Sequence, residues 1–228
     1  MKKLPLLIIS LLIVQVSAIT QPCLPEGITF TTQAQIDFFQ VNHPNCTEIE
    51  GDVAIQGNDI NNLNGLNVLT SIVGDLIIDG NETLTSLTGL ANVNFIGGDL
   101  NIIDNLALTT LEGLENLISV EGFLSIGTNI GLTSLEGLNN LASIGGSLSI
   151  WSNPNLISLT GIEGLNSIGE ILYIMWNDAL TNLNGLNNLT SIGSYLWIRE
   201  NTALTMLTGL DNIEAGSIDS LFILHNTS

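Results

Sequence analysis

Positive charge is nearly missing from this chain of 228 residues, which has three Lys and Arg residues in total and 22 acidic ones. Binding to nucleic acid depends on cationic side chains that displace counterions from phosphates. The composition therefore argues strongly against a nucleic-acid partner. Anionic membranes and polyanionic glycans are disfavoured on the same electrostatic ground.

Long apolar runs are also scarce, and the one candidate spans Leu4–Val16. It follows two Lys residues and leads into a small-residue cleavage site ending at Ala18. This order predicts a secretory signal peptide over residues 1–18, and the run is too short to predict membrane insertion. Its removal would leave Arg199 as the only basic residue, for a formal charge of −21 over 210 residues. We therefore expect a secreted or cell-surface protein.

Cysteine is limited to Cys23 and Cys46. In an exported chain, two early cysteines favour one disulfide bond. Cys23 lies five residues after the predicted cleavage point, so a lipoprotein anchor is not indicated. The cysteines lack the further ligands that a metal or redox site would need.

A 24-residue unit repeats almost without gaps from about residue 48 to the end. In the unit that starts at Ser143, counted as position 1, aliphatic residues occupy positions 6 and 8, and this alternation predicts a half-buried strand. Eight units share it. Position 6 holds Val53, Leu76, Leu100, Leu124, Leu148, Leu172, Leu196 and Leu221, and position 8 holds Ile55, Ile78, Ile102, Ile126, Ile150, Ile174, Ile198 and Ile223.

Further aliphatic residues recur at positions 14, 17, 20 and 23 of the unit, for example Leu108, Leu111, Leu114 and Leu117. A turn with apolar side chains on three sides cannot bury them without neighbours above and below. The sequence thus predicts a solenoid with parallel strands.

Two columns of the repeat have structural interpretations. An Asn after each strand is expected to turn inward and to satisfy loop backbone groups and its stacked neighbours, which we favour over a ligand-binding row of amides. A Gly column is expected to permit a positive φ or a close approach of coils. The Asn column is Asn58, Asn81, Asn105, Asn129, Asn153, Asn177, Asn201 and Asn226, and the Gly column is Gly65, Gly89, Gly113, Gly137, Gly161, Gly185 and Gly209.

The motif Leu-x-Ile-x-x-Asn-x-x-Leu-x-x-Leu-x-Gly-Leu, as it runs from Leu100, resembles the leucine-rich-repeat class and, within it, the receptor L domains. It is also similar to repeat proteins exported by bacteria, notably Bacteroidetes. The resemblance covers residues 46–228. It implies an all-β-rich, right-handed parallel β-helix of about eight turns, used as a noncatalytic recognition scaffold with no transferable functional residues.

Residues 19–47 do not fit the repeat and are expected to form an N-terminal cap closed by the disulfide. Ile28 and Phe30 suggest a short strand, and Thr32 to Gln35 has the spacing of a capping box that opens one helix. That helix would carry Ile36, Phe38, Phe39 and Val41. The repeats of residues 48–228 end without a cap, so we expect either a fragment of a longer protein or a docking partner at that end.

Few residues in the sequence are suited to catalysis. His43 and His225 lie at opposite ends of the predicted solenoid, so no nucleophilic triad can include both. An acidic column at position 5, together with two nearby carboxylates, is read as a solvated face in preference to a weak divalent-cation site. These residues are Asp52, Asp75, Asp99, Asp79 and Asp104. We therefore predict no enzyme activity, no cofactor and no metal.

The outward positions 5, 7 and 9, together with position 10, differ in composition between the first and the last turns. They hold all the Trp, all the Tyr and the only basic residue of the mature chain, a composition typical of interface hot spots. The candidate binding residues are Trp151, Tyr173, Met175, Trp176, Tyr195, Trp197, Arg199 and Phe222. Cover by a missing C-terminal segment and an aromatic ladder that merely stabilises the strands are the competing interpretations.

The leading hypothesis is an exported recognition or adhesion module that binds a protein or a neutral glycan on the sheet face of the last four turns. The alternative is a structural spacer within a larger surface protein. A carbohydrate-active enzyme ranks third. An ice-binding surface ranks fourth, because its Thr column is interrupted at Ile157.

Overall fold

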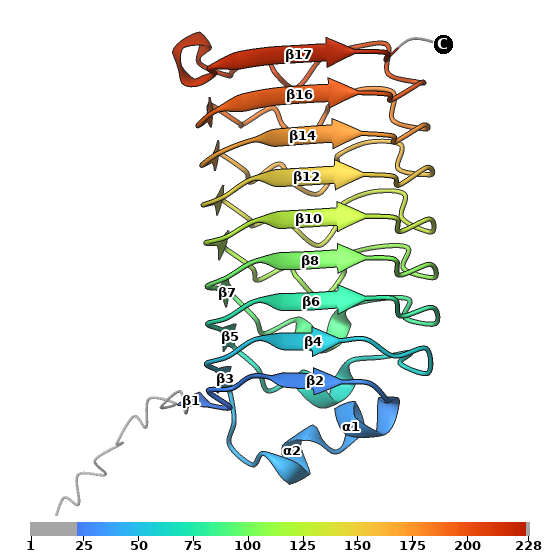
Figure 1. Cartoon of the computed structure of the whole chain (residues 1–228), viewed down its shortest axis with the longest axis vertical. Coiled ribbons are helices and arrows are strands. Elements are labelled where there is room, and N and C mark those ends of the chain that lie inside the picture. The colour runs from blue at the N-terminus through green and yellow to red at the C-terminus, as the bar shows by residue number, and fades with distance from the viewer. Residues whose placement is uncertain (1–21, 227–228) are drawn as a thin grey trace, which may run out of the picture.

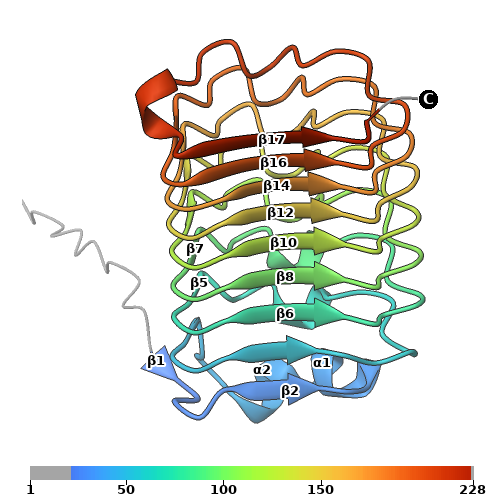
Figure 2. The same ribbon diagram turned by 45° about the horizontal axis from the view of Figure 1, so that its top comes forward.

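The computed structural model describes residues 22–226 and shows a parallel β-solenoid of about eight turns, which confirms the predicted fold class (Figure 1). The expected signal peptide lies outside the described residues. Each coil except the last contributes one strand to a long-strand sheet and one to a short-strand sheet, and a third side without strands closes it (Figure 2).

The long-strand sheet has nine parallel strands, and its order follows the chain. Neighbouring strands pair in register, with Leu124 opposite Leu148 and Ile126 opposite Ile150. Because the register is exact to the residue, the apolar columns at positions 6 and 8 stack inside the solenoid. The strands are β2 (Ile28–Phe30), β4 (Val53–Ile55), β6 (Leu76–Asp79), β8 (Leu100–Ile103), β10 (Leu124–Gly127), β12 (Leu148–Trp151), β14 (Leu172–Met175), β16 (Tyr195–Arg199) and β17 (Ser220–Leu224).

The short-strand sheet has eight strands of two residues each, again parallel. Most of them pair a Ser with a buried aliphatic residue, as in β11, where Ser143 precedes Ile144. The strands are β1 (Pro22–Cys23), β3 (Glu48–Ile49), β5 (Ser71–Ile72), β7 (Phe95–Ile96), β9 (Ser119–Val120), β11 (Ser143–Ile144), β13 (Ser167–Ile168) and β15 (Ser191–Ile192).

The third side consists of turns, with short 3-10 helices at η1 (Asn64–Leu66) and η2 (Thr88–Leu90). Its glycine column lets adjacent coils approach closely. Gly113 has a φ of 111°, and a Cβ there would collide with the carbonyl oxygen of Leu87 in the preceding coil. Both reasons foreseen for the glycines therefore apply at this position.

Aliphatic side chains from all three sides fill the core. Leu108, Leu111, Leu114 and Leu117 of one coil are all fully buried. Each coil packs on the coils before and after it, so the core is continuous along the solenoid axis.

The N-terminal cap begins with the predicted capping box, because Gln35 N–H and the Thr32 side chain, and Thr32 N–H and the Gln35 side chain, are hydrogen bonded. The expectation of one helix is wrong. Two short helices form, α1 (Gln33–Asp37) and α2 (Phe39–Asn42), which turn about Phe38. Ile36 and Phe39 are buried, whereas Phe38 and Val41 are exposed at 58% and 72%.

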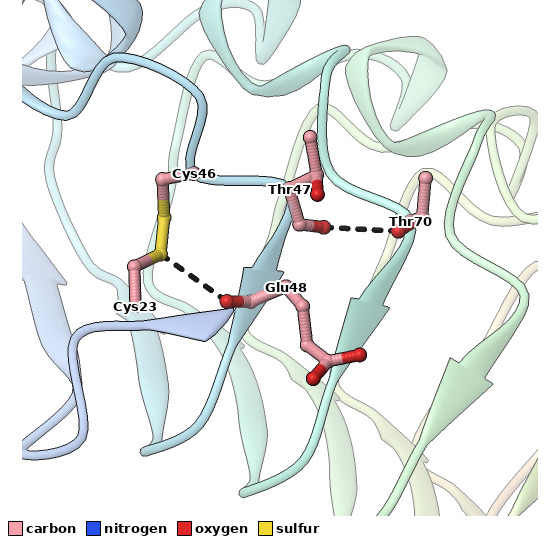
Figure 3. The surroundings of a disulfide bond; sticks show 5 residues. All are labelled: Cys23, Cys46, Thr47, Glu48 and Thr70. Atoms are coloured by element: carbon pink, nitrogen blue, oxygen red, sulfur yellow. Dashed lines mark hydrogen bonds between the residues drawn. A yellow bond between two sulfur atoms is a disulfide. The ribbon is translucent and has the colours of Figure 1, made fainter. Parts of the chain in front are cut away.

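The predicted disulfide joins Cys23 to Cys46 and is confirmed (Figure 3). It ties the end of β1 to the segment that enters β3. Beside it, the Thr70 hydroxyl donates a hydrogen bond to the backbone oxygen of Thr47 at 3.0 Å, so this corner is also held to the next coil. The disulfide thus closes the cap, and the hydrogen bond from Thr70 to Thr47 holds this corner to the next coil.

Within the described residues, β17 has no strand on its outer side. Leu221 and Ile223 are therefore 56% and 39% exposed, although Leu196 and Ile198 at the same positions of the preceding coil are buried. An apolar hollow of about 520 Å³ opens there. The 3-10 helix η3 (Ala215–Ser217) precedes β17 in the same coil. In residues 22–226, no helix combines the length and apolar character needed to cross a bilayer.

Candidate functional site

Seven of the eight predicted asparagines form a buried ladder along the solenoid. Asn129 shows the pattern: its N–H donates to Oδ1 of Asn153 at 3.1 Å, and its Nδ2 donates to the carbonyl oxygen of Ile102 at 2.8 Å. Each amide thus bonds to the coils on both sides, and its polar atoms are used internally. The ladder comprises Asn81, Asn105, Asn129, Asn153, Asn177, Asn201 and Asn226.

Asn58, the eighth predicted member, is exposed and does not belong to the ladder. Gly57 takes its place, because the Gly57 N–H donates to Oδ1 of Asn81 at 2.9 Å. The first coil is one residue short, and the missing residue is the one that precedes the ladder position in every later coil. The assignment of Asn58 is therefore corrected by one residue.

That preceding residue, at position 10, adopts the left-handed conformation in each later coil. Trp176 has a φ of 56°, and Thr128 has a φ of 52°. This conformation costs a residue with a Cβ more than it costs glycine. The residues in this column are Gly80, Asp104, Thr128, Ser152, Trp176, Glu200 and His225.

The acidic column at position 5 makes hydrogen bonds to backbone rather than forming only a solvated face. Oδ1 of Asp52 accepts from the N–H of Asp75 at 2.9 Å, and Oδ1 of Asp75 accepts from the N–H of Asp99 at 2.7 Å. Oδ1 of Asp99 in turn accepts from the N–H of Phe123 at 2.7 Å. These carboxylates therefore link successive coils.

Asp79 lies on the outward face of β6, close to Asp104 in the next coil. Partial burial, reinforced by the Asp104 charge, raises the pKa of the Asp79 carboxyl above its ordinary value. In the part of the chain from residue 22 to residue 226, no three His, Cys, Asp or Glu side chains are grouped so as to hold a metal ion.

The eight candidate binding residues lie on or beside the outward surface of the last strands of the long-strand sheet, which we call the aromatic face. Tyr173 is opposite Trp197, and Trp197 is opposite Phe222. Trp151, Met175 and Arg199 form the adjacent row. Trp176 follows β14 at the margin, and Tyr195 begins β16. The structure thus places these residues on or beside one surface: Trp151, Tyr173, Met175, Trp176, Tyr195, Trp197, Arg199 and Phe222.

Four rings of the aromatic face contact one another. The ring centroids of Trp197 and Phe222 lie 4.9 Å apart with an interplanar angle of 33°. Tyr173 meets Trp197 edge to face at 5.6 Å, and Tyr195 lies 6.4 Å from Phe222. The Trp197 Nε1 atom is buried without a hydrogen-bond partner. Trp176 and Tyr195 are the more exposed members, at 45% and 40%.

Trp151 is oriented away from this cluster. Its indole occupies the space that a side chain on Gly127 would fill, and its Nε1–H donates to the Ser125 hydroxyl at 3.1 Å. Met175, in the same row, is only 8% exposed and offers little surface to a ligand. The Arg199 guanidinium lies 3.4 Å from Oε1 of Glu200, so part of its charge is neutralised locally.

Several partners of the site were missed from the sequence. Glu200 follows Arg199 directly, which was the available signal for their ion pair. Gly127 lies opposite Trp151 in the register of β10 and β12. The repeat could therefore have shown that Gly127 leaves space for the Trp151 indole. A second, surface ladder was also missed, in which each Asn side chain donates to a backbone oxygen of the preceding coil. Its members are Asn92, Asn116, Asn140, Asn188 and Asn212.

Residues 45–113 match the receptor L domain family. The match covers the first coils of the solenoid and suggests a ligand-binding repeat module. It ends before the aromatic face begins, so it does not bear on which surface binds. Neither the search of curated proteins nor the search of solved structures gave a match. The disulfide and the family match together favour an extracellular location.

Proposed function

We propose that this protein is a noncatalytic recognition module that binds its ligand on the aromatic face. One observation carries the proposal: all Trp and Tyr residues of the chain gather on one surface, where Trp176, Tyr195 and Phe222 remain 45%, 40% and 38% exposed. Clustered Trp, Tyr and Arg are characteristic of the centres of binding interfaces.

The contrast along the same sheet supports this proposal. At position 7, where the last three strands carry Tyr173, Trp197 and Phe222, the earlier strands β4 to β12 carry Ala54, Ile77, Asn101, Ser125 and Ser149. Strand propensity alone would favour large aromatic or β-branched residues in every coil. The restriction of aromatic residues at position 7 to the last three coils therefore suggests a local role.

The chemistry of the remaining side chains fits a binding role better than catalysis. The carboxylates of the position 5 column are committed to backbone N–H groups. His43 packs on Phe39 in the cap, and His225 lies at the other end of the solenoid. We propose further that the chain is exported through a signal peptide over residues 1–18 and acts at the cell surface or beyond. Its ligand is a protein or a neutral glycan.

A structural spacer is the second candidate, and one observation favours it. The rings of Tyr173, Trp197 and Phe222 pack on one another, as they would in a ladder that only stabilises stacked strands. In that case, removing exposed aromatic side chains would change the stability of the protein, and no ligand whose binding depends on them would be found.

The test uses side chains that can be removed without opening the core. Trp176→Gly removes an indole where glycine suits the left-handed backbone, and Tyr195→Ser removes a ring at the start of β16. Val41→Ser and Phe38→Ser remove exposed apolar side chains at the opposite end and serve as controls. All four proteins and the wild type would be screened against arrays of neutral glycans and of extracellular proteins.

We expect a ligand that loses at least tenfold in affinity with each face variant, because an aromatic hot-spot residue contributes about 2 kcal/mol or more. The cap variants should bind as the wild type does. A ligand that is indifferent to both face variants would move recognition elsewhere, and the absence of any ligand would favour the spacer.

A further inference from the structure

We infer that the ligand of the aromatic face is a polypeptide whose contact surface has an apolar centre and a basic margin. This inference rests on the proposed function and adds the chemical class of the partner. It is carried by the orientation of the rings and by the charges that border them.

The rings of the aromatic face pack on one another. Strands in a sheet lie ~4.8 Å apart, and the 4.9 Å separation of the Trp197 and Phe222 rings shows that they stack along this direction. On the other side of Trp197, the Tyr173 ring makes a T-shaped contact with it. A pyranose ring binds an aromatic residue by stacking its C–H groups on an open ring face. Trp197 is flanked by rings on both neighbouring strands, which restricts access to its own ring, so this arrangement suits apolar side chains of a protein better than sugars.

Apart from the hydroxyls of Tyr173 and Tyr195, hydrogen-bonding groups for a sugar are few at the centre. The Trp197 Nε1–H is buried, and the Trp151 Nε1–H is used by Ser125. Arg199 is paired with Glu200. A neutral glycan, which is covered in hydroxyl groups, would leave many of them unpaired against such a surface, at a cost in free energy.

Carboxylates border the aromatic face on both sides. Glu170 and Asp219 lie just before the strands, where they accept only from the hydroxyls of Ser147 and Ser194 at 3.1 Å and 3.5 Å. On the other side, Asp178 accepts from the Thr202 hydroxyl at 3.1 Å. None of these three is paired with a cation in the described structure, so they would attract Lys and Arg side chains of a partner.

A second copy of this chain does not meet that requirement. Arg199 is the only basic residue after position 3, and it is already paired. Two aromatic faces brought together would also oppose their acidic margins. Charge complementarity therefore points to a different protein.

The experiment is a selection of random 12-residue peptides displayed on phage, with the full chain as target. Peptides that also bind the double variant Trp176→Gly/Tyr195→Ser would be discarded, which removes those held by net charge alone. Surviving peptides would be synthesised and titrated against Glu170→Gln and Asp219→Asn. Glu112→Gln and Glu136→Gln, which remove exposed carboxylates on the third side, are the matched controls. An array of neutral glycans would be probed in parallel with the wild type and the double variant.

We expect survivors rich in aromatic or large aliphatic residues together with Lys or Arg. Their affinity should fall at least threefold with Glu170→Gln or Asp219→Asn and remain unchanged with the two controls. Survivors without basic residues would overturn the inference about the margin. Glycans that bind only the wild type, with no surviving peptide, would overturn the polypeptide class and leave the proposed function intact. Binding by neither class would overturn both.

Discussion

Trp197 and Phe222 stack with their ring centroids 4.9 Å apart, so the central indole of the aromatic face is supported by the last strand. Side chains on the outer surface of a sheet would contribute little to stability if each stood alone. Here, the rings of neighbouring coils bury one another. The aromatic face is therefore both a surface and a packed layer, and the two roles can be separated by the choice of substitution.

Trp197→Ala should lower the free energy of unfolding by about 1–3 kcal/mol, because aromatic pairs contribute ~0.5–1.5 kcal/mol each beyond their buried area and this ring contacts two others. An outward position in the repeat would by itself predict almost no effect on stability. Urea denaturation of the wild type and the variant measures the difference. A change below ~0.5 kcal/mol would mean that the rings do not support one another.

Asn129→Leu should cost several kcal/mol, because it removes the Oδ1 acceptor of the Asn105 N–H and the donor to Ile102 inside the solenoid. Asn58→Leu is the matched control and should change stability by less than ~0.5 kcal/mol, since Asn58 is exposed. Thermal and urea denaturation would compare the two. Equal costs would place Asn58 back in the ladder.

Thr128→Gly should stabilise the protein by roughly 1 kcal/mol, because a β-branched residue at a φ of 52° is strained and glycine is not. The gain is reduced by the loss of the Thr128 hydroxyl, which accepts from the Asp104 N–H. Thr128→Ala removes the same hydroxyl and keeps a Cβ, so it should not stabilise. Calorimetry would measure the melting temperatures of both variants and of the wild type. A melting temperature of the alanine variant above that of the wild type would contradict the proposed backbone strain at Thr128.

Asp79→Asn should stabilise the protein at neutral pH. The pKa of Asp79 is raised in the folded state, so its charge opposes folding when it is ionised. This penalty is absent below the pKa of the unfolded state, ~3.9, and it grows as the pH rises through the raised folded pKa. Stability curves of the two proteins should therefore meet in acid and separate towards neutral pH. A difference that is largest in acid would show the opposite shift.

Cys46→Ser should lower the melting temperature while the far-ultraviolet circular dichroism keeps its β form. The disulfide closes the loop between Cys23 and Cys46, and the chain-entropy relation gives ~3 kcal/mol for a loop of this size. The remaining coils are held by contacts with their neighbours. Complete loss of β structure at room temperature would show that the solenoid depends on a sealed cap.

The fold could be predicted from the sequence because Leu and Ile recur at fixed positions, and each repetition is independent evidence for the same coil. Asn58 was assigned to the ladder because the one-residue gap in the first unit can be placed either before or after the ladder position. The hydrogen bond from the Gly57 N–H to Oδ1 of Asn81 decides between the two placements. The break at Phe38 has no strong local signal, since it depends on packing against the first coil.

The candidate site could be predicted only in part from the same repeat. The register of the strands brings Tyr173, Trp197 and Phe222 together, and that followed from the repeat. The orientation of each ring did not follow, because it depends on side-chain rotamers and on neighbours such as Gly127. Burial of Met175 likewise results from the side chains that surround it in three dimensions.

The central claim is that the aromatic face is the recognition surface, and the dissociation constant of its ligand for the double variant Trp176→Gly/Tyr195→Ser tests it most directly. Both side chains are substantially exposed, and neither contributes to the core. We predict a dissociation constant at least tenfold higher than that of the wild type, with an unchanged constant for Val41→Ser at the opposite end. An unchanged constant for the double variant, measured on folded protein, would contradict the claim.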